Sequence, residues 1–251
     1  MKILVIGGTG NVGSKVVSQL RAQHHNVIVG SPQTGINSYT GEGLAEAMQD
    51  TDVVIDLANS PEVDEQSAVD FFDRAGRNLG AAEISAGVKH HVAISIVGCD
   101  RMVNLGYMKG KVKQEEVLKN SGVPYTIVRS TQFFEFVPFI SNMAAQGNKV
   151  YGPATEFQPI AVEEAAAFIV KYALGNPING TVQIAGPERK PKSDFIQKYV
   201  NDKDPAKTVI ATGKFEYFGV EVPKDGMVPL GEANLGKVNF TEWLDIQSVS
   251  A

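Results

Sequence analysis

The chain has 251 residues, one cysteine and a formal net charge of -5, with 43% hydrophobic and 20% charged residues. This size suits one large α/β domain, the negative charge argues against a nucleic-acid or anionic membrane surface, and one cysteine excludes an internal disulfide framework. Because no apolar run approaches the roughly 18 residues of a membrane span, and the first residues begin a strand rather than a signal peptide, we expect a cytoplasmic protein.

The first twenty residues have the pattern of a strand, a glycine loop and a helix. Residues 2–6 are a continuous apolar run rich in branched side chains, which is typical of a strand buried on both faces of a parallel sheet. Residues 7–13 contain four glycines, and apolar residues then recur at helical spacing up to Leu20. The glycines fit both G-x-G-x-x-G, starting at Gly8, and G-x-x-G-x-x-G, starting at Gly7.

Such a loop is suited to a dinucleotide. Glycine can take a positive φ and admits a pyrophosphate close to the backbone, and the N-terminus of the following helix offers free N–H groups to the phosphates. We therefore predict cofactor contacts from the loop, namely Gly7, Thr9, Gly10, Asn11, Val12 and Gly13.

Strands and helices alternate along the rest of the chain. We expect strands at residues 27–30, 51–57, 91–97, 124–129 and 181–185, and helices at 44–48, 69–86, 107–120, 163–174 and 194–200, with a last helical turn around Trp243. This alternation predicts a Rossmann-like, doubly wound parallel sheet with right-handed crossovers. Residues 1–251 would form a single NAD(P)-binding domain, in which the chain from about residue 133 onward contributes a small C-terminal substrate cap.

Ligands of such folds bind beyond the carboxyl ends of the strands, so the residues that follow each strand are candidates. After the second strand there is neither an acidic residue for the 2′-hydroxyl of NAD nor a basic one for the 2′-phosphate of NADP. Ser31 and Gln33 can hydrogen-bond a phosphate, which favours NADP(H) over NAD(H). Further cofactor contacts are expected from Leu57, Ala58, Asn59, Ser60 and Thr131, and substrate contacts from Gln132, Phe133, Phe134 and Phe136, although the aromatic run could equally be core.

Three residues have the chemistry of carbonyl reduction. Tyr107 and Lys111 lie at i and i+4 on one face of a predicted helix, and Ser95 ends a predicted strand. A tyrosine hydroxyl can protonate the alkoxide that hydride transfer leaves, a neighbouring ammonium lowers its pKa, and a serine can hold the substrate oxygen. Lys111 could also bridge the ribose hydroxyls of the cofactor. Alternatively, the Tyr-x-x-x-Lys spacing is coincidental and Lys111 is only a solvated charge.

Cysteine and histidine carry no predicted chemistry in this chain. Cys99 is expected to be a small packed residue, since no activating partner can be argued from the sequence. The histidines occur as adjacent pairs, at residues 24–25 and 90–91, and neighbours on a strand point to opposite faces. We therefore predict no metal site.

The glycine loop, Ser95 and the stretch Tyr107-Met108-Lys109-Gly110-Lys111 resemble the short-chain dehydrogenase/reductase superfamily. Residues 122–129 and 132–135, together with residues 40–44 and 179–188, resemble its atypical, NmrA-like NAD(P)H-binding branch, to about residue 190. This resemblance implies a Rossmann-like fold, a bound dinucleotide and reductase activity. Relatives have arginine after the serine that matches Ser31, whereas Pro32 stands here.

Three functions are consistent with these observations. The first is an NAD(P)H-dependent oxidoreductase that reduces a carbonyl or conjugated double bond of a small apolar molecule. The second is a non-catalytic NAD(P)H-sensing regulator of the NmrA type, which would bind another protein through its C-terminal third. The third is a sugar-nucleotide epimerase, which needs cations to hold a diphosphate; Arg189, Lys190 and Lys192 are the candidates.

Overall fold

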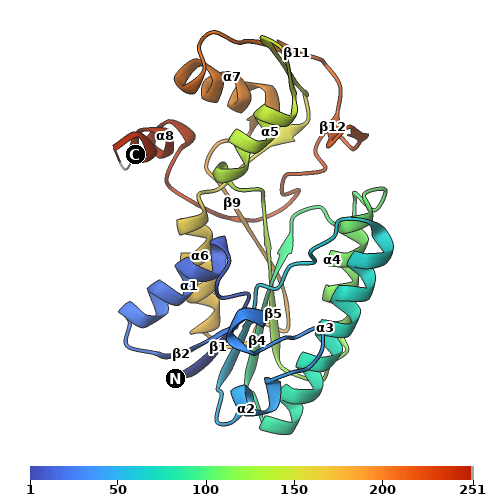
Figure 1. The fold of residues 1–251 in the computed structure, drawn as a ribbon, viewed down its shortest axis with the longest axis vertical. Coiled ribbons are helices and arrows are strands. Elements are labelled where there is room, and N and C mark those ends of the chain that lie inside the picture. The colour runs from blue at the N-terminus through green and yellow to red at the C-terminus, as the bar shows by residue number, and fades with distance from the viewer. Residues whose placement is uncertain (250–251) are drawn as a thin grey trace. The chain divides into compact units, whose positions relative to one another are not determined.

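The alternating strands and helices build the first of two compact units in the computed structural model, which describes residues 1–249 (Figure 1). Unit 1 comprises residues 1–129 and 165–182, and unit 2 comprises residues 130–164 and those from 183 onward. The elements of the first part are β1 (Lys2–Ile6), α1 (Asn11–Ala22), β2 (Asn26–Gly30), the 3₁₀ turn η1 (Pro32–Thr34), α2 (Leu44–Met48), β3 (Val53–Asp56), α3 (Glu65–Ala86), β4 (His90–Ile96), α4 (Gly106–Lys119), β5 (Tyr125–Ser130), α6 (Val162–Ala173) and β9 (Gly180–Ala185).

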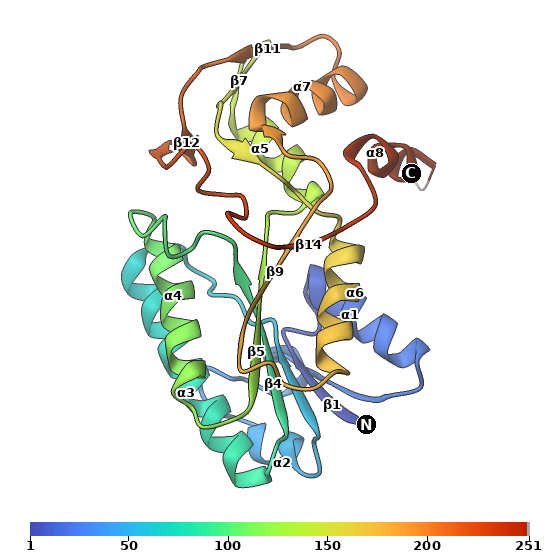
Figure 2. The same ribbon diagram turned by 180° about the vertical axis from the view of Figure 1, so that it is seen from behind.

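The central sheet has seven strands in the order β14-β9-β5-β4-β3-β1-β2, where β14 is Asn234–Leu235. Parallel pairing joins β1 to β2, β1 to β3, and β3 to β4. Helices α3 and α4 lie on one face of the sheet, and α1 and α6 on the other (Figures 1 and 2). The predicted doubly wound parallel sheet is confirmed.

The strand order reverses at β1. The chain runs outward from β1 to β2 and then returns to β3 on the other side of β1. Ile3, Leu4 and Val5 are fully buried, as a strand covered on both faces requires. The glycine loop after β1 therefore lies at the topological switch point, where open α/β sheets bind their ligands.

Helix α3 begins at Glu65, four residues before the predicted start. Asp64 is the N-cap, and its Oδ1 accepts a hydrogen bond from the backbone N of Ser67 at 3.0 Å. The first turn is polar, so the apolar period from which the helix was predicted starts only later. Gly87 ends the helix with a φ of 70°, as its expected role as a C-cap requires.

Unit 2 contains short strands and helices that the apolar pattern did not predict in full. They are η2 (Phe134–Phe136), α5 (Val137–Met143), β6 (Ala145–Gln146), β7 (Lys149–Gly152), β8 (Glu156–Phe157), β10 (Lys190–Pro191), α7 (Lys192–Lys203), β11 (Thr208–Ala211), β12 (Glu216–Tyr217), β13 (Val220–Glu221) and α8 (Phe240–Val249). Strands β11, β7 and β6 form a small sheet, and α5 packs against α7. The predicted last helical turn is a helix of ten residues.

Aromatic rings form the core of unit 2. The ring of Phe240 lies 5.2 Å from that of Phe134, 5.5 Å from that of Phe195 and 5.6 Å from that of Trp243, measured between centroids. Phe157 extends the group through a contact of 5.6 Å with Phe195. The proposed substrate cap, which would begin near residue 133, stays a prediction.

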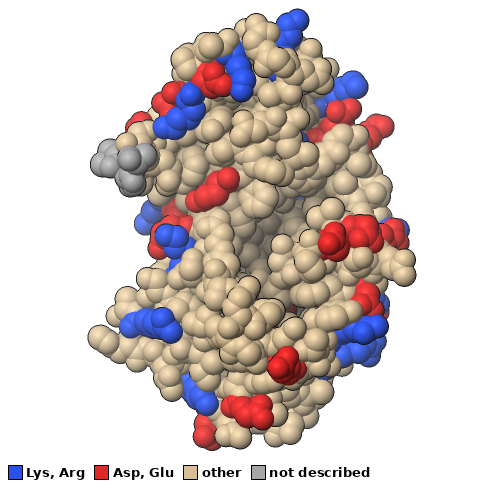
Figure 3. Space-filling model, in the orientation of Figure 1, with Lys and Arg blue, Asp and Glu red and all other residues tan. Residues whose placement is uncertain are grey.

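Charged side chains of both signs are interspersed over the face drawn in Figure 3. No helix within residues 1–249 combines the length and the apolar character that crossing a bilayer demands.

Candidate functional site

The glycine loop connects β1 directly to α1. Gly7 has a φ of 72°, and its backbone N donates to the carbonyl of Gly30 at 2.8 Å. Gly10 is the N-cap of α1 in an extended conformation, and no side chain caps the amides of the first turn. These N–H groups, at the positive end of a twelve-residue helix, are therefore available to an anion.

The space around each glycine of the loop indicates its role. A Cβ on Gly7 would lie 2.5 Å from the carbonyl oxygen of Leu57, and one on Gly13 would lie 2.1 Å from that of Gly7. Gly8 is almost as crowded, with the carbonyl oxygen of Val5 at 2.9 Å. Gly10 is different: its Cβ would meet only the carbonyl oxygen of Gly7, at 3.3 Å. Gly7 and Gly13 thus permit the turn and the close packing, whereas the surface over Gly10 is open to a ligand.

The end of β2 carries a buried hydroxyl. Ser31 is 4% exposed, and within the described residues its Oγ has no hydrogen-bond partner. Gln33, in η1, is exposed. A buried hydroxyl without a hydrogen bond destabilises the folded protein unless a ligand supplies that hydrogen bond. Ser31 and the open surface at Gly10 therefore both fit a dinucleotide.

The end of β3 meets the predicted catalytic tyrosine. Leu57, Ala58 and Ser60 are buried, whereas Asn59 is exposed. The hydroxyl of Tyr107 donates to Oδ1 of Asn59, which comes from a loop 48 residues earlier in the chain. The structure thus brings a predicted catalytic residue and a predicted cofactor residue together.

The pKa of Tyr107 changes in the direction opposite to the one expected. Burial raises it above its ordinary value, because desolvation disfavours the phenolate. The ring packs edge-on against Phe72, with centroids 6.0 Å apart. The predicted lowering by Lys111 is therefore wrong for this structure. As a neutral hydroxyl, Tyr107 remains a donor.

Lys111 is buried, at 3% exposure, rather than solvated. Its Nζ donates to the carbonyl of Ile94 at 2.8 Å and to Oε1 of Gln114, and it lies 4.6 Å from the ring centroid of Phe72. Burial lowers the pKa of Lys111 to about 8. Among residues 1–249, its hydrogen bonds include none to Tyr107, so this structure does not join the two residues directly.

Ser95 belongs to a separate buried cluster. The residue is 2% exposed, and its hydroxyl donates to Oε1 of Glu115 at 2.7 Å. Arg129 binds the same carboxylate twice, at 2.7 and 2.8 Å, and donates to Asp100 at 2.9 Å. Burial would raise the pKa of Glu115, but these hydrogen bonds lower it to about 2. In this structure the hydroxyl proton of Ser95 is therefore donated to Glu115 within the cluster.

Cys99 lies in the same cluster as a buried free thiol. Burial raises its pKa to about 11. This agrees with the expected packing role.

The remaining predicted residues lie in unit 2 and have different environments. Thr131 is buried, and its Oγ1 has no hydrogen-bond partner within residues 1–249. Gln132 accepts from the hydroxyl of Tyr217 at 3.1 Å. Phe136 is 38% exposed, and its ring lies 6.5 Å from that of Phe133. Phe134 is fully buried in the aromatic core, so its predicted role in a pocket wall is wrong.

Sequence reasoning missed Asp56 and Gln114 in unit 1. The Nε2 of Gln114 donates to Oδ2 of Asp56 at 2.7 Å, and both residues are 3% exposed. Asp56 ends a strand that is otherwise wholly apolar, and a carboxylate in such a run is a signal of a buried polar site. Within residues 1–249, no cluster of three or more His, Cys, Asp or Glu could hold a metal ion.

Residues 36–177, more than half of the chain, match the model of a family described as NAD(P)H-binding. The match begins after residues 7–13, so the glycine loop is independent support for a nucleotide. The predicted NAD(P)H-binding family is confirmed.

Two curated proteins show a more distant similarity. The photosystem II assembly factor Ycf39 of Synechocystis sp. is 25% identical over 218 residues, covering 78% of this chain and 66% of the relative. The chloroplastic divinyl chlorophyllide a 8-vinyl-reductase of Cucumis sativus is 26% identical over 223 residues, covering 74% and 52%. The chain thus spans between half and two thirds of the length of these relatives.

The fold also matches a solved structure. The dTDP-4-dehydrorhamnose reductase of Clostridium acetobutylicum superimposes with a TM-score of 0.81 over 100% of both chains, at 19% identity. At this identity the match shows a shared fold.

Proposed function

Because this chain belongs to the NAD(P)H-binding family, we propose that it is an NAD(P)H-dependent oxidoreductase of the atypical short-chain type. The substrate would be a small apolar molecule with a carbonyl or a conjugated double bond. The observation that carries the proposal is the hydrogen bond from Tyr107 to Asn59, because it joins a proton donor to the edge of the sheet where the cofactor would bind. When bound, the cofactor supplies a hydride.

Several residues of unit 1 would bind the cofactor and act on the substrate. The amides at the N-terminus of α1 would hold the pyrophosphate, and Gly10 would let it approach. Lys111 would bind the ribose hydroxyls: an ammonium has three donors, and the hydrogen bonds to Ile94 and Gln114 use two of them. Tyr107 would donate a proton to the substrate oxygen, and Ser95 would orient that oxygen once its proton is released from Glu115.

NADP(H) is the cofactor that we propose. The support is Ser31, whose buried Oγ needs a partner, together with the absence of an acidic side chain in the turn at residues 31–34 that would repel a 2′-phosphate. A preference of tenfold or more for NADH would contradict this choice.

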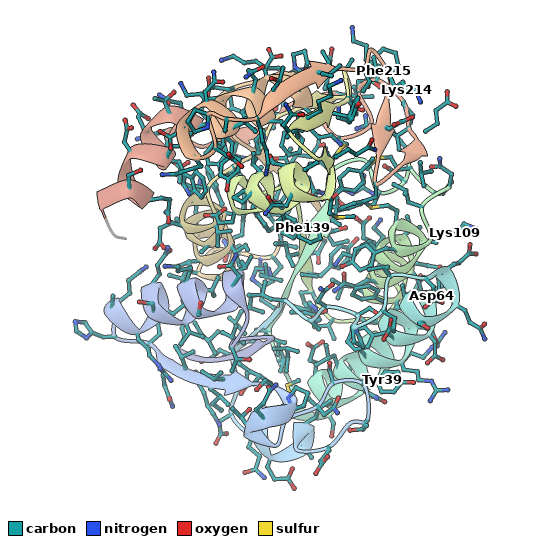
Figure 4. All side chains as sticks on the ribbon, turned by 45° about the horizontal axis from the view of Figure 1, so that its top comes forward. Tyr39, Asp64, Lys109, Phe139, Lys214 and Phe215 are labelled. Atoms are coloured by element: carbon teal, nitrogen blue, oxygen red, sulfur yellow. The ribbon has the colours of Figure 1, made fainter. Side chains whose placement is uncertain are left out.

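Exposed aromatic rings in unit 2 support an apolar substrate. Phe139 on α5 (Figure 4) is 51% exposed and Phe218 is 47% exposed, and their rings lie 6.4 Å apart. Phe136 continues the row, 6.5 Å from Phe139. Exposed apolar patches mark ligand-binding grooves as well as protein-interaction sites, so aromatic aldehydes, quinones and enones are the first compounds to assay.

The experiment combines turnover with cofactor titration. Tyr107→Phe removes the proton donor, so reduction of a substrate should slow by roughly a hundredfold or more, while affinity for NADPH barely changes. Lys111→Ala should lower both the rate of reduction and the affinity for NADPH. Tyr39→Phe is the matched control, since its hydroxyl donates to Asp70 at 2.7 Å rather than to any of the proposed residues. Full activity in Tyr107→Phe would mean that the proton comes from elsewhere.

A non-catalytic NAD(P)H sensor of the NmrA type is the second candidate. It is favoured by one observation: Ser95, Tyr107 and Lys111 bond Glu115, Asn59 and Gln114 rather than one another. A sensor would bind NADPH but reduce none of the assayed compounds, and Tyr107→Phe would change nothing.

The epimerase is less well supported, because its candidate cations have partners within unit 2. Arg189 binds Glu156 at 2.7 Å and Lys190 binds Glu188 at 2.7 Å. Lys192 is buried and donates to the carbonyl of Glu216 at 3.0 Å.

A further inference from the structure

A row of buried polar side chains leads from Lys111 into the core of unit 1. The Nζ of Lys111 donates to Oε1 of Gln114, and the Nε2 of Gln114 donates to Oδ2 of Asp56 at 2.7 Å. The other carboxylate oxygen, Oδ1, accepts from the backbone N of Ala58 at 3.0 Å. Three elements, α4, β3 and the loop after β3, thus meet at one carboxylate.

The chemistry of the two end groups determines the orientation of the Gln114 amide. An ammonium only donates and a carboxylate only accepts, so the amide oxygen must face Lys111 and the amide nitrogen must face Asp56. Turning the amide over would place donor against donor and acceptor against acceptor. Gln114 is therefore an oriented connector, and its position on α4 is held from both sides.

The row continues beyond Asp56 to a second pair of charges. Nε2 of His91 lies 4.0 Å from Oδ2 of Asp56, and Nδ1 of His91 lies 2.6 Å from Oε1 of Glu83. Burial alone would lower the pKa of His91, but Glu83 and Asp56 raise it above its ordinary value. With His91 and Lys111 protonated, two positive charges balance the two carboxylates of Asp56 and Glu83. This balance is what makes four buried ionisable groups tolerable.

We propose that Asp56 and Gln114 are positioning residues for Lys111, which hold its ammonium group in place and keep it charged for binding the dinucleotide. This inference rests on the proposed role of Lys111 in cofactor binding and deepens it. The Asp56 carboxylate bonds Gln114 and not Lys111 itself, so it stabilises the Lys111 ammonium without accepting one of its hydrogen bonds. The third N–H of Lys111 therefore stays available to the ribose hydroxyls.

Three acidic groups favour the charged form of Lys111 against the effect of its burial. They are Asp56 on β3, Cys99 in the loop after β4, and Glu115 on α4. On the α3 side the group packed against Nζ is the uncharged ring of Phe72. Glu115 is already neutralised by its two hydrogen bonds from Arg129, and Cys99 is uncharged below about pH 11. Asp56 is therefore the carboxylate whose removal should affect Lys111 most.

The test measures the affinity for NADPH by fluorescence between pH 6.5 and 10 in five proteins: wild type, Asp56→Asn, Gln114→Met, Lys111→Ala and Asp52→Asn. Wild-type affinity should weaken as the pH rises through about 8, where Lys111 loses its proton. Asp56→Asn and Gln114→Met should move that midpoint down by about one pH unit. Asp52→Asn makes the same change in a half-buried carboxylate that pairs with the exposed Lys89, and it should leave the midpoint unchanged.

The outcomes separate this inference from the proposed function. If wild type shows the midpoint and both network variants keep it, the positioning role is overturned while the role of Lys111 stands. If wild-type affinity does not change through pH 8 and Lys111→Ala binds NADPH normally, Lys111 does not contact the cofactor and both ideas fail. Gln114→Met alters no charge and little volume, so it keeps the test decisive if the buried Asp56→Asn does not fold.

Discussion

Replacing Gly10 with aspartate should abolish dinucleotide binding without weakening the fold. The position tolerates a side chain, because Gly10 is extended, with a φ of -75°, and its Cβ would meet only one atom, at 3.3 Å. Aspartate is also a favoured N-cap, worth a few tenths of a kcal/mol over glycine. Its charge near the positive end of α1 adds about 0.3–1 kcal/mol. The free energy of unfolding should therefore stay the same or rise by up to about 1 kcal/mol.

Binding should respond in the opposite direction. The new carboxylate would occupy the amides that the pyrophosphate needs, and two unit charges about 4 Å apart repel by about 4 kcal/mol at an effective dielectric constant of 20. Since each 1.4 kcal/mol corresponds to a factor of ten, the Kd for NADPH should rise by at least a hundredfold. Fluorescence titration measures the Kd, and urea unfolding followed by circular dichroism measures the stability.

Gly231→Asp is the matched control for Gly10→Asp. Gly231 is exposed, has no atom within 4 Å of its would-be Cβ, and lies in unit 2. The same charge change there should leave NADPH binding unaltered. If Gly10→Asp binds NADPH within threefold of wild type, the loop does not hold the pyrophosphate. A loss of more than 2 kcal/mol of stability would contradict the N-cap argument.

Three further predictions concern single side chains. Pro32→Arg should tighten NADPH binding by about 1–2 kcal/mol through one charge-assisted contact and leave NADH binding unchanged, as parallel titrations would show. Because the pKa of His91 is raised on folding, its contribution to stability is full below its ordinary value of 6.5 and is lost as the pH rises through the folded value; the stability advantage of wild type over His91→Gln in urea should thus be larger at pH 6 than at pH 9. Cys99 should react with a thiol reagent at pH 8 only after unfolding, since burial raises its pKa to about 11; rapid labelling of the native protein would contradict the packing assigned to it.

Features that depend on neighbours in the chain could be predicted from the sequence. Strand β1, the glycine loop and helix α1 follow from short-range rules. Only glycine fits the turn at position 7 and the close packing at position 13. The alternation of apolar strands and helices predicted the doubly wound sheet for the same reason. The sequence therefore predicted a nucleotide site at the glycine loop, whereas the strand order that places this loop at the switch point comes from the structure.

Side-chain partners distant in the chain were decided only by the tertiary structure. Helical spacing puts Tyr107 and Lys111 on one face, but Tyr107 bonds Asn59, 48 residues away, and Lys111 reaches Asp56 through Gln114. The pKa of Tyr107 rises because packing buries it, and burial is not a property of local spacing. Phe134 shows the same limit: an aromatic run indicates burial, but only the fold decides whether a ring meets a ligand or, as here, the core.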